Sequence, residues 1–212
     1  MAKNLQHPTN DEADSEYAAR RMAFHPYNIF MSLVLIGVTM LFIAFSAAYI
    51  YTRFQSDIPT IKLPNLFIFN TFILIGSSLT IRWANTSYKK DDTKQYQLAL
   101  LVTIVLTCIF MVLQMVAWQD LVHQDIFVAT STMASYLYLI SGLHFMHVIA
   151  GLPFLILFYH AALKKMKEPV SVLVYFSDPE KRLKLKLLTF YWHFLDALWI
   201  YLVLFFLVNR LF

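Results

Sequence analysis

FYWHFLDALWIYLVLFF, residues 190–206, is the stretch that decides the fold. It is apolar enough to cross a membrane as a helix, yet it carries a carboxylate, Asp196, near its centre. A charged group in hydrocarbon costs about 3 kcal/mol or more, so it persists only where other protein groups satisfy it. His193 lies three residues earlier and would share a helical face with Asp196. The stretch therefore predicts a membrane-spanning helix whose polar residues face other helices.

The composition of the whole chain favours the same class. Of its 212 residues, 59% are hydrophobic and 14% are charged, which is more apolar than a soluble domain requires. Runs long enough to cross a hydrocarbon layer of about 30 Å recur along the sequence. The fourth run is longer than one perpendicular crossing needs, and we expect one long helix that is tilted or protrudes on the side of Asp125, with Pro153 as a possible kink. We predict an all-α, polytopic membrane protein with five transmembrane helices in one bundle, at about 27–51, 63–81, 98–118, 126–163 and 187–208.

Basic residues predict the topology. Fourteen of the 17 lysines and arginines lie in the N-terminal tail, after the second span and before the fifth, and three lie in the other segments. By the positive-inside rule the N-terminus is cytoplasmic and the C-terminus is outside. Residues 1–26 are polar and carry charges of both signs, so we expect a cytoplasmic tail. The single cysteine, Cys108, excludes a disulfide within the chain.

The polar residues inside the spans admit three interpretations. His147 and His193 could be axial ligands of a haem between the fourth and fifth spans. Asp196 and the histidines could form a proton relay. Alternatively, these groups satisfy one another inside a packed bundle and fix how the fourth and fifth spans associate. A zinc or copper site on the histidines would need a further donor. The polar cluster predicted within the bundle comprises His144, His147, His193, Asp196 and Gln114.

Three segments carry a resemblance to a known family. YWHFLDALW (191–199) and SGLHFMHVIAG (141–151) closely resemble the two signature segments of subunit III of the haem-copper terminal oxidases. NTFILIGSSLTI (70–81) and Gln114 are similar to further parts of that family. The resemblance extends over all five spans in order. It implies the five-helix prokaryotic form, with residues 27–212 as the subunit III domain.

The resemblance also implies a function. Members of the family carry no haem or copper of their own. They pack beside the catalytic subunit I, hold phospholipids between their helices and support proton uptake by the catalytic subunit. For this chain it implies oxidase subunits I and II as partners, haem and copper in those partners, and the prokaryotic cytoplasmic membrane as its location. Candidates for contact with lipid headgroups are Arg82, Trp83, Arg182, Lys184 and Lys186.

The sequence departs from the family at three positions. Many members carry a glutamate where this chain has Val38, and another where it has Ala117. Phe145 stands where the family often has a glycine. A direct role in proton movement is therefore not carried over from the family. Two alternative functions stay open, a related subunit of a nitric oxide reductase and a membrane anchor that binds haem b.

Overall fold

The computed structural model describes residues 26–56, 64–166 and 169–211 of the chain. This part of the chain forms six helices, and no strand is found in it. Five of them are long and apolar enough to cross a membrane, so the chain is a multi-pass membrane protein. The helices are α2 (Pro26–Ser56), α3 (Asn65–Lys89), α4 (Thr93–His123), α5 (Thr132–Lys165), α6 (Pro169–Ser177) and α7 (Pro179–Leu211).

The five predicted spans are confirmed as helices, and most of them extend beyond the apolar runs. Polar caps set several of the boundaries. Asp92 accepts a hydrogen bond from the backbone N–H of Gln95 and begins α4. Asp178 accepts from the N–H of Glu180 and begins α7, with Pro179 at the first helical position. Lys181 also donates a hydrogen bond to Asp178 and lowers the pKa of that carboxyl below its ordinary value.

One expectation needs correction, one helix was not predicted, and one expectation lies outside the described residues. The fourth span does not begin at Ile126. A turn precedes α5, which starts at Thr132 because Ser131 caps it by accepting from the N–H of Ala134. The short helix α6 was not predicted, because its nine residues are too few for a span and lie between charged segments. The predicted cytoplasmic tail, residues 1–26, is outside the described part of the chain except for Pro26.

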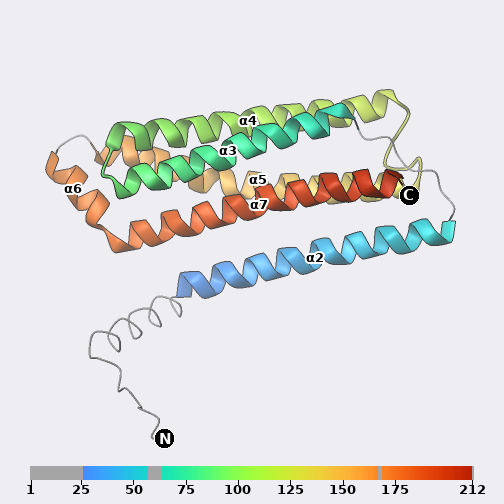
Figure 1. Ribbon diagram of the computed structural model, residues 1–212, viewed down its shortest axis with the longest axis horizontal. Coiled ribbons are helices and arrows are strands. Elements are labelled where there is room, and N and C mark those ends of the chain that lie inside the picture. The colour runs from blue at the N-terminus through green and yellow to red at the C-terminus, as the bar shows by residue number, and fades with distance from the viewer. Residues whose placement is uncertain (1–25, 57–63, 167–168, 212) are drawn as a thin grey trace, which may run out of the picture.

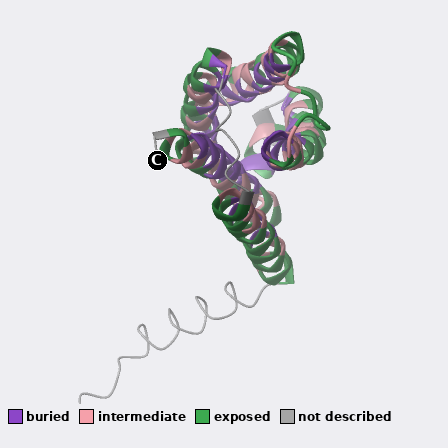
Figure 2. Ribbon diagram, turned by 90° about the vertical axis from the view of Figure 1, so that its right-hand side faces the viewer, coloured by how far each residue is buried: buried purple, intermediate pink, exposed green. Residues whose placement is uncertain are grey.

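The long helices run up and down in turn, and Figure 1 shows them nearly parallel to one axis. α3 and α4 form a tightly packed hairpin, α7 packs against α2, α3 and α5, and α4 also contacts α5. α2 packs against α5 and α7 at the edge of the bundle, where most of its surface is exposed (Figure 2). The start of α2, the α3–α4 turn, the end of α5 and α6 all lie at one end of the molecule. Most of the lysines and arginines lie in the segments at this end, and we call it the basic end.

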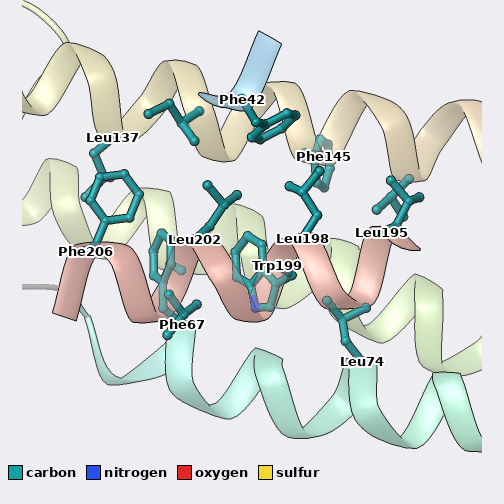
Figure 3. Packing of buried hydrophobic residues seen from close by; sticks show 14 of the residues in the cluster. Phe42, Phe67, Leu74, Leu137, Phe145, Leu195, Leu198, Trp199, Leu202 and Phe206 are labelled. Carbon is teal, nitrogen blue, oxygen red and sulfur yellow. The ribbon is translucent and has the colours of Figure 1, made fainter. Parts of the chain in front are cut away.

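The largest core cluster lies where α7 meets α3, α4 and α5. Trp199 is fully buried there. Its ring stacks on Phe67 of α3 with the centroids 5.5 Å apart, and meets Phe110 of α4 edge to face at 5.2 Å. Figure 3 shows Trp199 beside Leu198 and Leu202 of the same helix, above Phe67. Aromatic packing of this kind places α7 at the centre of the fold.

Candidate functional site

The two signature segments lie on α5 and α7, which pack against each other. His144 is fully buried on α5, and its Nε2–H donates to the backbone carbonyl oxygen of Leu195 on α7 over 3.2 Å. Its ring also lies 4.9 Å from the ring of Trp199. Among the five residues of the predicted polar cluster, His144 is the one whose side chain links the fourth and fifth spans. The partner is a backbone carbonyl group.

His147 lies one turn further along α5 and turns toward α2. Its Nδ1–H donates to the carbonyl oxygen of Leu143, 2.7 Å away in the same helix. Its ring meets that of Phe42 of α2 with the centroids 6.3 Å apart. The backbone carbonyl oxygen of His147 accepts a hydrogen bond from the hydroxyl of Tyr191, 2.9 Å away on α7. This residue therefore joins α5 to α7 through its backbone and to α2 through its ring.

His193 and Asp196 share a face of α7, as their spacing predicted, and that face meets α3. Nδ1 of His193 lies 2.6 Å from Oγ of Ser78. The hydroxyl of Ser78 also interacts with the carboxyl group of Asp196, which is buried. One carboxyl oxygen, Oδ2, has no hydrogen-bond partner among the described residues. The ionisable pair of α7 is therefore satisfied mainly from the second span, through one small residue.

Gln114 makes a separate contact between α4 and α3. Its Oε1 accepts a hydrogen bond from Nδ2 of Asn70 over 3.0 Å, and both side chains are fully buried. Next along α3, Thr71 accepts a hydrogen bond from Nε1 of Trp199, and Ser77, the residue before Ser78, accepts one from Nε1 of Trp192. These hydrogen bonds tie α3 to α4 and α7. The partners on α3 were missed as functional residues by the sequence analysis.

The five residues of the predicted polar cluster therefore occupy four places in the bundle. His147 faces α2 and His193 faces α3, so the two do not turn toward a common space for a haem between α5 and α7. In the described part of the chain, no group of three or more His, Cys, Asp or Glu side chains lies close enough to hold a metal ion. The geometry favours helix association over a cofactor site on these histidines.

A pocket of about 590 Å³ opens between α2, α3 and α7, in the half of the bundle nearest the basic end. Its lining includes two cations, Arg82 of α3 and Lys186 of α7, and His193. The remaining lining residues are polar and apolar: Asn28, Met31, Ser32, Asn85, Leu187, Thr189 and Phe190. A pocket with apolar walls and cations at the level of the helix ends suits an amphipathic anion.

Of the five residues predicted to contact lipid headgroups, two line the pocket and three do not. Arg82 and Lys186 line the pocket together. Nε1 of Trp83 donates to Oε1 of Gln95 over 3.1 Å, and Lys184 pairs with Glu180 at 2.7 Å. Arg182 is exposed on the first turns of α7, and like Trp83 and Lys184 it does not line the pocket. The structure therefore places two of the five candidates, Arg82 and Lys186, where one bound headgroup could contact both.

Comparison with known proteins identifies the family. The family model described as Cytochrome c oxidase subunit III matches residues 20–209, which include almost all of the helices. The chain belongs to this family. It is 31% identical over 150 residues to a protein named "Probable cytochrome c oxidase subunit 3" from Rickettsia felis, covering 69% of this chain and 50% of that protein. It is 27% identical over 177 residues to cytochrome c oxidase subunit 3 of Pelomedusa subrufa, covering 76% of this chain and 63% of that protein.

The chain spans about half to two thirds of the length of these cytochrome c oxidase subunit III relatives. At the two positions where the resemblance implies a glutamate in many members of the family, the side chains here are apolar and buried. Val38 lies on α2 and is 8% exposed, and Ala117 lies on α4 and is fully buried. Because residue 38 is a valine, α2 carries no carboxylate at this position.

Ser78→Ala tests the polar contact between α3 and α7. The substitution removes the hydroxyl that contacts both His193 and Asp196, so the buried Asp196 and the half-buried His193 each lose a partner. We expect the free energy of unfolding in detergent to fall by about 1–3 kcal/mol, the usual cost of a buried unsatisfied group. The matched control is Ser46→Ala, because Oγ of Ser46 is buried without a partner among the described residues and its removal should cost little or nothing. Equal stabilities of the two variants would contradict the role given to Ser78.

Proposed function

We propose that this chain is the accessory subunit III of a haem-copper terminal oxidase in a prokaryotic cytoplasmic membrane. It packs beside the catalytic subunit I, in a complex that also contains subunit II, and contributes no redox centre of its own. The observation that carries the proposal is the match of the subunit III family over residues 20–209. The matches to Rickettsia proteins support a prokaryotic membrane.

The arrangement of the helices suits a supporting role. α7 is held from three sides by aromatic packing and by hydrogen bonds from α3 and α5, so the bundle is a rigid scaffold. Its outer surface is rich in exposed apolar side chains, on which lipid and the transmembrane helices of a partner can pack. A rigid apolar surface of this kind stabilises a neighbouring subunit without taking part in its chemistry.

The orientation that we propose places the basic end in the cytoplasm, with the N-terminus inside and the C-terminus outside. The start of α2, the α3–α4 turn and the start of α7 lie at this end (Figure 1). The sequence concentrates its lysines and arginines in the segments that meet there. Reporter fusions after Lys90 and after Phe212 test it. A cytoplasmic signal after Lys90 and an external one after Phe212 are expected, and the reverse pattern would contradict it.

Co-purification tests the proposed function. An affinity tag at the C-terminus should recover a haem-copper subunit I and subunit II from mildly solubilised native membranes. The recovered complex should consume oxygen, and dissociation of this chain from it should leave all haem and copper with the partners. Recovery of the chain with bound haem and without an oxidase would contradict the proposal.

We also propose that the chain binds a phospholipid in the pocket between α2, α3 and α7. Arg82 and Lys186 would face the phosphate of an anionic headgroup, while the acyl chains pack on exposed apolar side chains of α2 and α7. Neutralising both in Arg82→Gln/Lys186→Gln is expected to weaken retention of anionic phospholipid. At about 1 kcal/mol per cation, the loss is about fivefold for each.

Native mass spectrometry of the purified complex measures this retention. The matched control is Lys90→Gln, which removes a cation from the same end of the molecule but away from the pocket. The control should keep the wild-type amount of lipid. If the double variant also keeps it, the pocket is not the lipid site.

A further inference from the structure

The short helix α6 has an unusual place in the molecule. It connects α5 to α7 at the basic end, and Figure 1 shows it running across the ends of the long helices instead of along them. With nine residues, Pro169–Ser177, it is much too short to cross a bilayer. If the long helices cross the membrane, α6 lies at its surface.

One face of α6 is fixed to the bundle. Tyr175 and Phe176 are buried. The backbone carbonyl oxygen of Tyr175 accepts a hydrogen bond from the hydroxyl of Tyr88 over 3.0 Å, and the ring of Phe176 meets that of Tyr88 at 5.0 Å. Nζ of Lys181 lies 4.7 Å from the centre of the Tyr175 ring. These contacts determine which side chains of α6 point outward.

The outward side chains include two large apolar ones. Leu173 is 66% exposed and Val174 is 64% exposed, although their neighbours Tyr175 and Phe176 are buried. Exposure of this kind on a helix that is firmly held on its other face is unfavourable in water. It is favourable where the helix lies in the interface between headgroups and acyl chains.

The charged residues around α6 indicate what Leu173 and Val174 contact. Lys164 and Lys165 end α5, and Arg182 follows the start of α7, all on the exposed surface. The neighbouring acids are neutralised locally, because Asp178 pairs with Lys181 at 2.8 Å and Glu180 pairs with Lys184. Cations beside a small apolar patch are typical of a helix that binds an anionic leaflet.

We propose that α6 is an interfacial anchor. Leu173 and Val174 enter the boundary between headgroups and acyl chains of the leaflet at the basic end. The cations at the end of α5 and the start of α7 bind the phosphates of anionic lipids there. The anchor fixes the depth of α5 and α7 in the bilayer. It is separate from the pocket at Arg82 and Lys186, which lies between α2, α3 and α7.

Site-specific photo-crosslinking in the native membrane tests the anchor on the intact complex. The photoreactive amino acid p-benzoylphenylalanine replaces Leu173 in one variant and Val174 in a second. Both positions are exposed, so folding should be kept. After illumination, mass spectrometry of the purified chain should find phospholipid adducts at both positions. The matched control carries the same amino acid at Lys90, an exposed position in the α3–α4 turn, where we expect at least fivefold less lipid adduct.

If α6 contacts a protein instead of lipid, the crosslinked product will be different. A crosslink from 173 or 174 to another protein would show that a partner subunit covers α6, and a crosslink to a second copy of this chain would indicate a dimer. Either product, or lipid adducts no more frequent than at Lys90, would overturn the anchor. A crosslinking yield that falls when anionic lipids are depleted from the membrane would support it further.

Discussion

Replacing Trp199 with alanine is expected to cause the largest loss of stability of any single truncation in this chain, about 3–5 kcal/mol. Trp199 is fully buried and contacts three helices besides its own. Its ring stacks on Phe67, meets Phe110 edge to face and lies 4.9 Å from the ring of His144. Its Nε1–H also donates to Thr71. Truncation therefore leaves a cavity between α3, α4, α5 and α7, and removes one hydrogen bond.

The measurement is unfolding of the purified chain in a mild detergent, followed by far-UV circular dichroism. Phe190→Ala is the matched control, because Phe190 is on the same helix but 60% exposed. It should change the midpoint little, since lipid or detergent replaces the lost contacts. Trp199→Phe should fall between wild type and Trp199→Ala, because it keeps ring packing and loses the hydrogen bond to Thr71. Similar effects of Trp199→Ala and Phe190→Ala would contradict the central position of α7.

Much of the fold could be predicted from the sequence, because a membrane imposes a minimum helix length. Uncharged runs such as 27–51 leave few alternatives to a spanning helix. The boundaries were less predictable. α7 begins at Pro179, well before its apolar run, because Asp178 caps a basic first segment that lies outside the hydrocarbon. α6 was missed because its stability comes from contacts with Tyr88 and Tyr96, which only the folded hairpin provides.

The candidate site could be predicted in part. Spacing correctly placed His193 and Asp196 on one face of a helix. It could not say which neighbour that face meets, since this depends on the rotation of α7 within the bundle. The partner is Ser78, which the sequence indicated only as part of the segment 70–81 that resembles the family. His144 likewise meets a backbone carbonyl group, for which no side-chain pattern exists.

One pattern in the sequence did point to α3. Small polar residues recur in pairs seven positions apart, Asn70 with Thr71 and Ser77 with Ser78, within an otherwise apolar span. Seven residues make about two helical turns, so both pairs face the same side. In the structure they face α4 and α7 and supply the partners of Gln114, Trp199, Trp192 and His193. Pairs of this kind predict which face of a span is buried.

Gly151→Leu is the second substitution for which we expect a large effect, because two aromatic side chains of α7 pack tightly against α5 at this glycine. A Cβ atom at Gly151 would lie 2.9 Å from Cε1 of Tyr191 and 3.0 Å from Cζ3 of Trp192. Neither ring can easily move away. The hydroxyl of Tyr191 is held by the carbonyl oxygen of His147, and Nε1 of Trp192 by Ser77. We expect a loss of about 3 kcal/mol, the upper part of the usual range for overpacking.

The matched control for this close approach is Gly142→Leu on the same helix. A Cβ atom at Gly142 would have nothing within 4 Å, so leucine fits there and also favours the helix over glycine by up to about 1 kcal/mol. Unfolding in detergent should therefore separate the two variants clearly. Because intrinsic helix propensity favours both changes equally, the difference between them measures the packing of α5 on α7 alone. Equal midpoints would mean that the two signature segments are not held together at Gly151.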